Sequence, residues 1–452
     1  MKIKVIEKSY SEVMEIAGQK RKHKKPIRPS MFFRTLMKLI SAPDLKSARF
    51  TKEKIGMEKL GKNESALYLM NHSSFIDLEI VADLLYPRPF NIITTSDGFI
   101  GKEWLMRQIG CIPTNKFVTD TTLVRDILYA VRKKKSNVVL FPEAGYTFDG
   151  KATTLPDTTA GLIKLLGIPV VTITSFGAFS RDPLYNNLQK RNVPVHAVEK
   201  YALSAEDIKR MSAEEIDAVV SEAFSFDGFE WQHENKIKIN EPFRADGLNR
   251  VLYKCPHCQA EGEMLGRGIF LTCKHCNETY VLNEYGYLEY KGKSISPESL
   301  SAENTEEAEN RDGAKFKRIP DWYEWERECV KAELLEDKYS FDIPVDVCMT
   351  VDTRCIYHVG EGKLIHNKDG FKLTANDNSF SYEHKPKSSH TVNSDFNWYE
   401  LGDIVSFGTN NFLFYCFPKV SGDVVSKMRL AAEELYKILK AEDIEKRAKP
   451  NG

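Results

Sequence analysis

Between residues 66 and 178 the chain alternates short apolar runs with segments of helical period. The apolar runs are rich in β-branched residues and cover residues 66–70, 91–94, 137–141 and 169–176. Residues 119–132 lie between the second and third of these runs, and their apolar side chains recur every three or four positions, as on one face of a helix. Strands that alternate with helices predict an α/β domain with a mostly parallel sheet.

The last quarter of the chain has a different pattern. After an expected helix over 319–335, β-type runs recur at turn-like spacing over 345–351, 355–358, 371–375, 380–384, 397–401, 404–407 and 412–417. A closing helix carries an apolar stripe through Met428, Ala431 and Leu435. This order of elements resembles a pleckstrin-homology-like (PH-like) domain, a fold that binds lipid headgroups or protein partners without deciding which.

The N-terminal segment combines basic and apolar residues. Residues 20–28 are a basic run, and in the helix expected after it Phe33, Leu36, Met37 and Ile40 share one side. Such a helix can rest in a lipid headgroup layer, or it can pack on its own domain. Residues 1–17 do not resemble a signal peptide, and no uncharged apolar run approaches the roughly 18 residues of a spanning helix. We therefore expect a cytoplasmic protein, peripheral on the cytoplasmic face of a membrane.

The stretch from Leu69 to Asp77 contains a candidate catalytic pair. His72 and Asp77 are five residues apart, which would place them about 140° apart on one helix. They can meet only if His72 lies in a loop and Asp77 in the first turn of the next helix. A carboxylate on one imidazole nitrogen then fixes the tautomer, and the other nitrogen can take a proton from a hydroxyl. The alternative is a helix-capping carboxylate beside an ordinary loop histidine.

Four sequence blocks give this pair a context. They are Asn71-His-Ser-Ser-Phe-Ile-Asp77, Gly110-Cys-Ile-Pro-Thr-Asn-Lys116, Phe141-Pro-Glu-Ala-Gly145 and Gly167-Ile-Pro-Val-Val171. In this order the region from about 30 to 200 resembles the 1-acylglycerol-3-phosphate acyltransferase (glycerolipid acyltransferase) family. The resemblance implies that His72 is the base and that Asp77 orients it. It also implies transfer of an acyl group from acyl-CoA or acyl carrier protein to a lysophospholipid hydroxyl.

The acceptor site implied by the resemblance departs from the family in two places. We assign Asn71, Lys116, Glu143 and Gly145 to this site, with Lys116 facing any phosphate. The arginine that ends the family's second block is Lys116 here, and the third-block Thr-Arg is replaced. Lysine binds phosphate as a point charge, whereas arginine binds it through two parallel hydrogen bonds. The identity of the lysolipid acceptor therefore stays open. For Glu143 we expect a role in fixing Lys116 or a backbone turn.

Four of the nine cysteines form two Cys-x-x-Cys pairs, Cys255 with Cys258 and Cys273 with Cys276. The 14 residues between the pairs and the strand signals around them predict a four-thiolate zinc ribbon, in which the zinc is structural because no coordination position is open. The rest of the cysteine usage suits a reducing compartment. Acidic residues surround the pairs, so we expect no nucleic acid partner.

The predicted plan has five parts. They are an N-terminal basic amphipathic segment (1–45), an acyltransferase-like domain (46–245), a zinc ribbon (246–290), a flexible linker (291–318) and a PH-like domain (319–445). The chain has 64 basic and 64 acidic residues, so its net charge argues neither for nor against a charged partner. Two alternatives to the enzyme remain, a non-catalytic lipid- or protein-binding adaptor that retains the acyltransferase fold and a zinc-ribbon nucleic-acid-binding protein.

Overall fold

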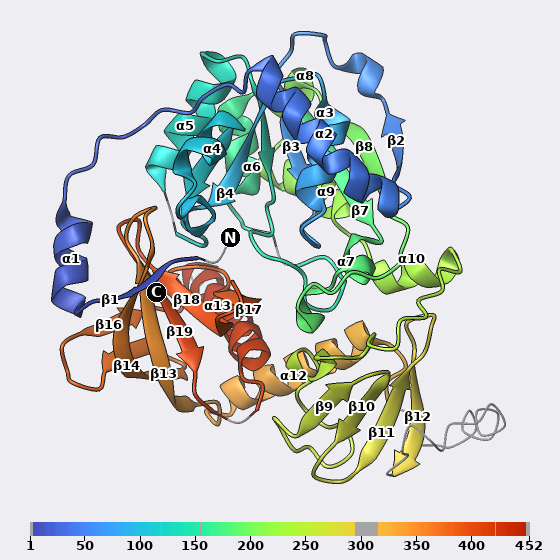
Figure 1. Ribbon diagram of the computed structural model, residues 1–452, viewed down its shortest axis with the longest axis vertical. Coiled ribbons are helices and arrows are strands. Elements are labelled where there is room, and N and C mark those ends of the chain that lie inside the picture. Colours follow the sequence, from blue (N-terminus) through green and yellow to red (C-terminus); the bar gives the residue numbers. More distant parts are fainter. Residues whose placement is uncertain (1–2, 119, 154, 294–314, 421, 449–452) are drawn as a thin grey trace.

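The computed structural model describes residues 3–118, 120–153, 155–293, 315–420 and 422–448. Three sheets form in this part of the chain, and Figure 1 shows the largest α/β unit above a β-rich unit and a small four-stranded unit. The α/β unit is called the acyltransferase-like domain below, the β-rich unit the β domain, and the small unit the ribbon.

The acyltransferase-like domain is built on a seven-stranded sheet in the order β2-β8-β7-β3-β6-β4-β5. Its strands are β2 (Thr51–Ile55), β3 (Leu67–Met70), β4 (Phe90–Thr95), β5 (Cys111–Thr114), β6 (Asn137–Leu140), β7 (Val170–Phe176) and β8 (His196–Leu203). All neighbours are parallel except β7 and β8, which confirms the predicted mostly parallel sheet. The edge strand β2 escaped prediction because it is exposed throughout and lacks an apolar pattern.

Helices cover both faces of this sheet. They are α2 (Met31–Ser47), α3 (Asp77–Leu85), α4 (Glu103–Gln108), α5 (Thr121–Arg132), α6 (Thr159–Leu166), α7 (Ala178–Arg181), α8 (Ala205–Arg210) and α9 (Ala213–Ala223), with short 3-10 turns η1 (Met57–Lys59) and η2 (Ser96–Phe99). The 3-10 turn η3 (Leu184–Asn186), the helix α10 (Gly228–Glu234) and the 3-10 turn η4 (Leu248–Arg250) instead join a core shared with the ribbon and the β domain. In β3, Tyr68 and Met70 join the core under α2 and α3, whereas Leu67 and Leu69 join the core on the opposite face. A strand buried on both faces reads as a continuous apolar run, which is why the sequence revealed it.

The β domain contains one antiparallel sheet in the order β16-β15-β14-β13-β19-β18-β17. Its strands are β13 (Phe341–Thr350), β14 (Ile356–Asn367), β15 (Gly370–Ala375), β16 (Ser381–His384), β17 (Asn393–Trp398), β18 (Gly402–Gly408) and β19 (Leu413–Pro418), followed by α13 (Val425–Ala448). A strand forms at six of the seven predicted positions, the run predicted over 397–401 overlaps β17 only at Asn397 and Trp398, and a single helix closes the domain. The PH-like assignment itself stays a prediction.

The N-terminal segment is divided between two domains, so the prediction of one unit over 1–45 needs correction. β1 (Val5–Glu7) pairs with β14, and α1 (Tyr10–Gly18) follows it beside the β domain (Figure 1). The ring of Tyr10 lies 4.6 Å from that of Phe380. The rest of the segment contacts the acyltransferase-like domain, where His23 pairs with Asp126 at 2.9 Å and α2 packs through Met37 and Leu45. Because β1 is only three residues long, it is too short to show a periodic pattern, and the sequence did not predict its pairing with β14.

The ribbon is a four-stranded antiparallel sheet that leads into the β domain. Its strands are β9 (Met264–Arg267), β10 (Phe270–Cys273), β11 (Glu278–Leu282) and β12 (Leu288–Lys293). The linker predicted over 291–318 begins inside β12, and its residues 294–314 lie outside the described residues. The chain then enters α12 (Ile319–Leu335), where the Trp322 indole donates a hydrogen bond to the Lys254 carbonyl at 3.0 Å. This contact ties the ribbon to α12.

Candidate active site

His72 and Asp77 meet at the carboxyl end of β3. His72 lies in the loop after the strand, and Asp77 is the first residue of α3. His72 Nδ1 lies 3.0 Å from Asp77 Oδ2, which also accepts hydrogen bonds from the backbone N–H groups of Ser73 at 2.7 Å and Ser74 at 3.1 Å. A carboxylate at the start of a helix is further favoured by the helix dipole. The loop-to-helix arrangement that the spacing required is therefore formed.

The surroundings of His72 suit a proton acceptor. Burial lowers the pKa of His72, and its hydrogen bond to Asp77 opposes that shift without reversing it. The imidazole is therefore neutral at pH 7, and with Nδ1–H donated to Asp77 its Nε2 carries a free lone pair. The side chain remains 21% exposed, so a substrate hydroxyl can reach it.

Two aromatic rings lie against the imidazole. The ring of Phe141 lies 4.2 Å from that of His72, and the ring of Tyr146 lies 4.3 Å from it. Both residues come from the segment after β6, the strand that pairs with β3. Stacking restricts rotation of the imidazole, so it complements the hydrogen bond to Asp77 in fixing the orientation of Nε2.

Glu143 supports the backbone of the catalytic loop. Its Oε2 accepts a hydrogen bond from the His72 backbone N–H at 2.7 Å, and its Oε1 accepts from the Thr153 backbone N–H at 2.8 Å and hydroxyl at 3.0 Å. Burial raises the pKa of Glu143 to about 7. Of the two roles expected for it, the contacts correspond to the one on a backbone turn, with Lys116 not among its hydrogen-bond or ion-pair partners.

The other assigned acceptor-site residues lie in three different settings. Asn71 is 1% exposed, and its amide bonds to Ser73 and Ser175, so it lies behind the pair rather than facing an acceptor. At Gly145 an added Cβ would meet open space. Lys116 follows β5, and its ammonium helps to lower the pKa of His72, which places it within electrostatic reach of the imidazole.

The chain is similar to known proteins over part of its length. Residues 52–175, which include the His72 loop, β5, Lys116 and β6, match the family model described as Acyltransferase. This part of the chain is similar to acyltransferases, and the acyltransferase-like domain is called the acyltransferase domain below. No match to the chain is found among curated proteins. Among solved structures, the chain is similar to the 1-acyl-sn-glycerophosphate (LPA) acyltransferase PlsC from Thermotoga maritima, with 16% identity, a TM-score of 0.34, and coverage of 42% of this chain and 76% of that one.

The β domain contacts the loops at the active-site edge of the acyltransferase domain. Trp398 Nε1 donates a hydrogen bond to Asp97 Oδ2 at 3.1 Å, and Arg429 Nη1 donates to the Tyr146 carbonyl at 3.1 Å. The Asn115 amide donates to the Thr409 carbonyl at 2.9 Å. These partners are about 280 to 300 residues apart in the chain, so no local pattern in the sequence pointed to them.

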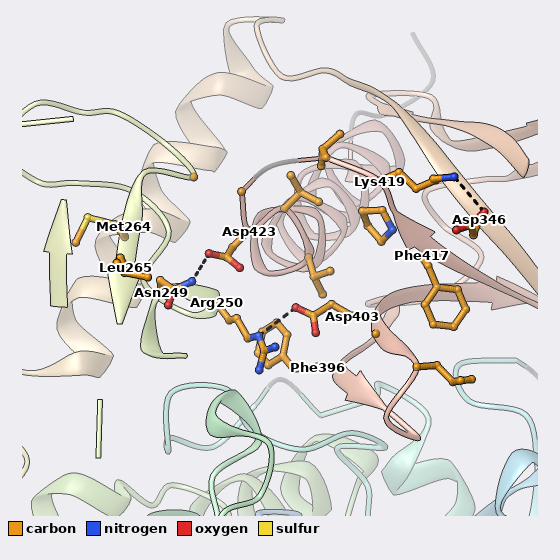
Figure 2. A pocket seen from close by; sticks show the side chains of 18 of the residues that line it. Asn249, Arg250, Met264, Leu265, Asp346, Phe396, Asp403, Phe417, Lys419 and Asp423 are labelled. Atoms are coloured by element: carbon orange, nitrogen blue, oxygen red, sulfur yellow. Dashed lines mark hydrogen bonds and ion pairs between the residues drawn. The ribbon is translucent and has the colours of Figure 1, made fainter. Parts of the chain in front are cut away.

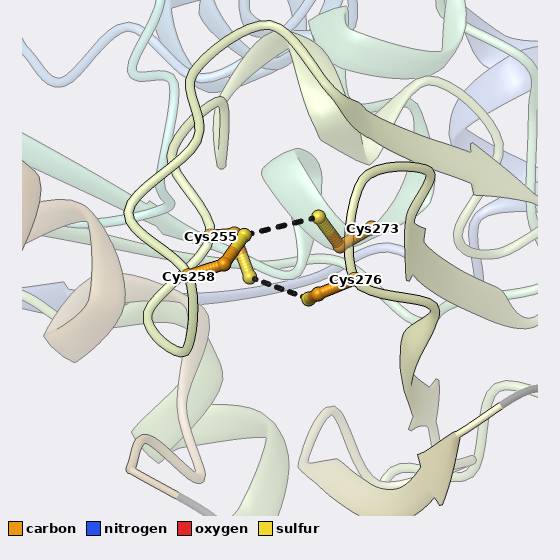
Figure 3. Close-up of side chains that lie close together, drawn as sticks. All are labelled: Cys255, Cys258, Cys273 and Cys276. Atoms are coloured by element: carbon orange, nitrogen blue, oxygen red, sulfur yellow. Dashed lines mark hydrogen bonds between the residues drawn. The ribbon is translucent and has the colours of Figure 1, made fainter.

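The two Cys-x-x-Cys pairs form one cluster in the ribbon (Figure 3). The four sulfur atoms all lie within 4.8 Å of one another, and the Cys255–Cys276 and Cys258–Cys273 distances are both 3.7 Å. A tetrahedral ion with metal–sulfur bonds of about 2.3 Å requires sulfurs about 3.8 Å apart. The cluster therefore fits a tetrahedral metal ion held by four thiolates.

A cleft of about 540 Å³ lies between the ribbon and the β domain (Figure 2). The cations that line it are already paired, Arg250 with Asp403 at 3.2 Å, Lys419 with Asp346 at 3.5 Å and Lys274 with Glu263 at 3.5 Å. Among the lining residues that the structure describes, none belongs to the catalytic loops. The cleft is therefore distinct from the candidate site at His72.

Proposed function

We propose that this protein transfers a fatty acyl group from the thioester of acyl-CoA or acyl carrier protein to the hydroxyl of a lysophospholipid. The observation that carries the proposal is the hydrogen bond between His72 and Asp77 within an acyltransferase domain. The four sequence blocks support a glycerolipid acceptor such as 1-acylglycerol-3-phosphate. Phospholipid biosynthesis is the process to which this reaction would belong.

In the proposed reaction His72 Nε2 takes the proton of the acceptor hydroxyl while its oxygen attacks the thioester carbonyl. A carbon–oxygen bond forms, and the carbon–sulfur bond breaks. The leaving thiolate receives the proton from the His72 imidazolium, so the enzyme ends in its starting state. Asp77 stabilises the transient imidazolium, and Glu143 keeps the loop in place through the His72 backbone.

We also propose that the acyltransferase domain rests on a membrane surface, where its acceptor is found. In the described residues no helix is long and apolar enough to cross a bilayer. Instead, large apolar side chains are exposed on α2 and α4, among them Phe32 at 69% and Trp104 at 68%; the others are Met31, Leu39, Ile40 and Leu105. Phe75, between His72 and Asp77, is 66% exposed. Apolar side chains near basic residues 20–28 suit an anionic lipid surface.

For the ribbon we propose a structural zinc ion bound by Cys255, Cys258, Cys273 and Cys276. Four thiolates leave no open position for a substrate or water. The ion would hold the two loops of the ribbon together beneath α12, where the ring of Tyr280 packs 5.0 Å from that of Trp322. Its role would be to stabilise the connection between the acyltransferase domain and the β domain.

The direct test is to incubate purified protein with labelled acyl-CoA or acyl carrier protein and a panel of lysolipids. Wild type should acylate at least one lysophospholipid, and His72→Ala should not. If the two proteins behave alike on every acceptor, the chain is better described as an adaptor that retains an acyltransferase fold. The β domain packed on the catalytic loops is the feature that such an adaptor would use.

A further inference from the structure

The closing helix α13 of the β domain contacts the segment that follows the third block. Arg429 of α13 donates a hydrogen bond from Nη1 to the Tyr146 carbonyl at 3.1 Å. Its guanidinium carbon also lies 4.3 Å from the centroid of the Phe148 ring, which is the geometry of a cation–π contact. Phe148 in turn stacks on Phe396 of β17, with ring centroids 4.5 Å apart. One side chain of the β domain therefore contacts two residues of this segment.

The peptide group that accepts the bond from Arg429 is bonded to His72 at its other end. Its carbonyl belongs to Tyr146, and its N–H, which is the backbone N–H of Thr147, donates to the His72 carbonyl at 3.2 Å. The C=O and N–H of a trans peptide group point in opposite directions within one plane. Arg429 and the backbone of His72 are therefore joined through a single planar group.

The same peptide group carries a ring that lies against the imidazole. The ring centroids of Tyr146 and His72 are 4.3 Å apart. Rotation of the peptide group would therefore displace this ring and break the bond to the His72 carbonyl. The hydrogen bond from Arg429 opposes that rotation, and a charged donor makes a stronger bond than a neutral one.

Arg429 is itself held in one orientation by a buried carboxylate. Its Nε donates to Glu433 Oε1 at 3.1 Å, one turn further along α13, and Glu433 Oε2 accepts a bond from Arg327 of α12 at 2.8 Å. Arg429 and Glu433 are only 6% and 4% exposed. Because the guanidinium is planar, the bond at Nε fixes the direction in which Nη1 points. The donor to the Tyr146 carbonyl is thus preorganised.

We propose that Arg429 is a positioning residue for His72, so that the acyltransferase domain reaches full activity only with α13 of the β domain docked on it. This inference rests on the proposed function. Arg429 does not act on the substrate. It fixes the peptide group between Tyr146 and Thr147, and that group keeps the imidazole in the orientation set by its hydrogen bond to Asp77.

The test compares three full-length variants with wild type. Arg429→Gln removes the charged donor to the Tyr146 carbonyl. Arg429→Lys keeps the positive charge beside Glu433, but its single nitrogen cannot reproduce both arginine contacts, and it is the second variant if Arg429→Gln does not fold. Tyr436→Phe is the matched control, because it removes a bond of 3.0 Å between the same helix and Asp157 of the acyltransferase domain. Melting temperature and circular dichroism verify that each variant is folded.

Acyl transfer is measured with the donor and the lysophospholipid on which wild type is most active. Arg429→Gln should lower kcat about tenfold or more and leave KM within about twofold of wild type, because a misplaced base slows the chemical step without removing a binding contact. Arg429→Lys should lower kcat less, and Tyr436→Phe should match wild type. Wild-type kcat in both Arg429 variants, a change confined to KM, or an equal loss in Tyr436→Phe overturns the positioning role.

A magnetic resonance signal of His72 gives a readout that does not depend on activity. In protein that contains isotope-labelled histidine, the ring protons of His72 should resonate upfield, since they lie in the ring currents of Phe141 and Tyr146. This signal, assigned by its loss in His72→Gln, should shift in Arg429→Gln and stay in place in Tyr436→Phe. An unshifted signal in Arg429→Gln overturns the proposal. If wild type acylates no lysolipid, a shifted signal still supports the positioning of His72, and it is the proposed function that is refuted.

Discussion

The carboxylate of Glu143 accepts a hydrogen bond from the backbone N–H of His72 at 2.7 Å. This bond joins the third block to the first across the pair formed by β6 and β3. The Thr147 backbone N–H returns a bond to the His72 carbonyl at 3.2 Å. His72 is thus held on both sides of its backbone by a segment some 70 residues away.

Replacing the proposed base should abolish acyl transfer without unfolding the domain. His72→Ala removes the proposed acceptor of the hydroxyl proton, so we expect a loss of about 10³-fold or more in kcat. Asp77→Asn should lower kcat less, by about 10²-fold, because the base remains and only its orientation is impaired. Asp83→Asn on the same helix is the control, and its kcat should equal that of wild type. Near-wild-type turnover by His72→Ala would contradict the mechanism.

The pH profile of kcat/KM should report the lowered pKa of His72. A base with a lowered pKa stays neutral as pH falls through 6.5, so activity should decline only below that value. Asp77→Asn removes an influence that raises this pKa, and the acidic limb should move further down. Glu143, with a pKa of about 7, titrates nearby. An acidic limb that disappears in Glu143→Gln would show that the limb belongs to Glu143 instead.

Freshly purified protein should contain one zinc ion per chain by elemental analysis. Cys273→Ser should lose the ion and lower the melting temperature, because metal binding and folding are coupled in small sites. Cys329→Ser is the matched control, since Cys329 lies on α12 outside the cluster. Wild-type protein free of zinc would count directly against the assignment.

Binding to vesicles that contain anionic lipid should depend on the exposed apolar side chains of α2. The double variant Phe32→Ser with Ile40→Ser should bind about tenfold more weakly or worse, since each side chain contributes roughly 1 kcal/mol when partly inserted. Deleting residues 1–40 is a poorer test because it also removes β1 from the β domain. Leu335→Ser is the control, as Leu335 is 66% exposed on α12. Equal binding by both variants would place the membrane contact elsewhere.

Lys116 should matter more for phosphorylated acceptors than for neutral ones. Lys116→Ala should raise KM for a lysophospholipid about tenfold and leave KM for a monoacylglycerol nearly unchanged, because only the former offers an anion. Lys116→Arg should preserve or improve activity, since the guanidinium fork adds a hydrogen bond. Identical losses on charged and neutral acceptors would mean that the phosphate is not the ligand of Lys116.

Local patterns determined much of this protein from the sequence alone. The buried strand β3 is a continuous apolar run, and the seven strands of the β domain alternate with turn signals, so both were predictable from side-chain period. The Cys-x-x-Cys pairs define their own cluster because two short loops of fixed geometry present all four sulfurs. His72 and Asp77 were identifiable because the interval of five residues admits contact in only one local arrangement.

Contacts between distant segments were decided only by the tertiary structure. The residue pattern predicts one apolar stripe on α2, but Ile40 on that stripe is 68% exposed while Met37 packs on the domain. Periodicity reports which side chains share a face of their own element, whereas the partner of that face depends on how the elements pack. That packing brought the β domain to the active-site edge of the acyltransferase domain.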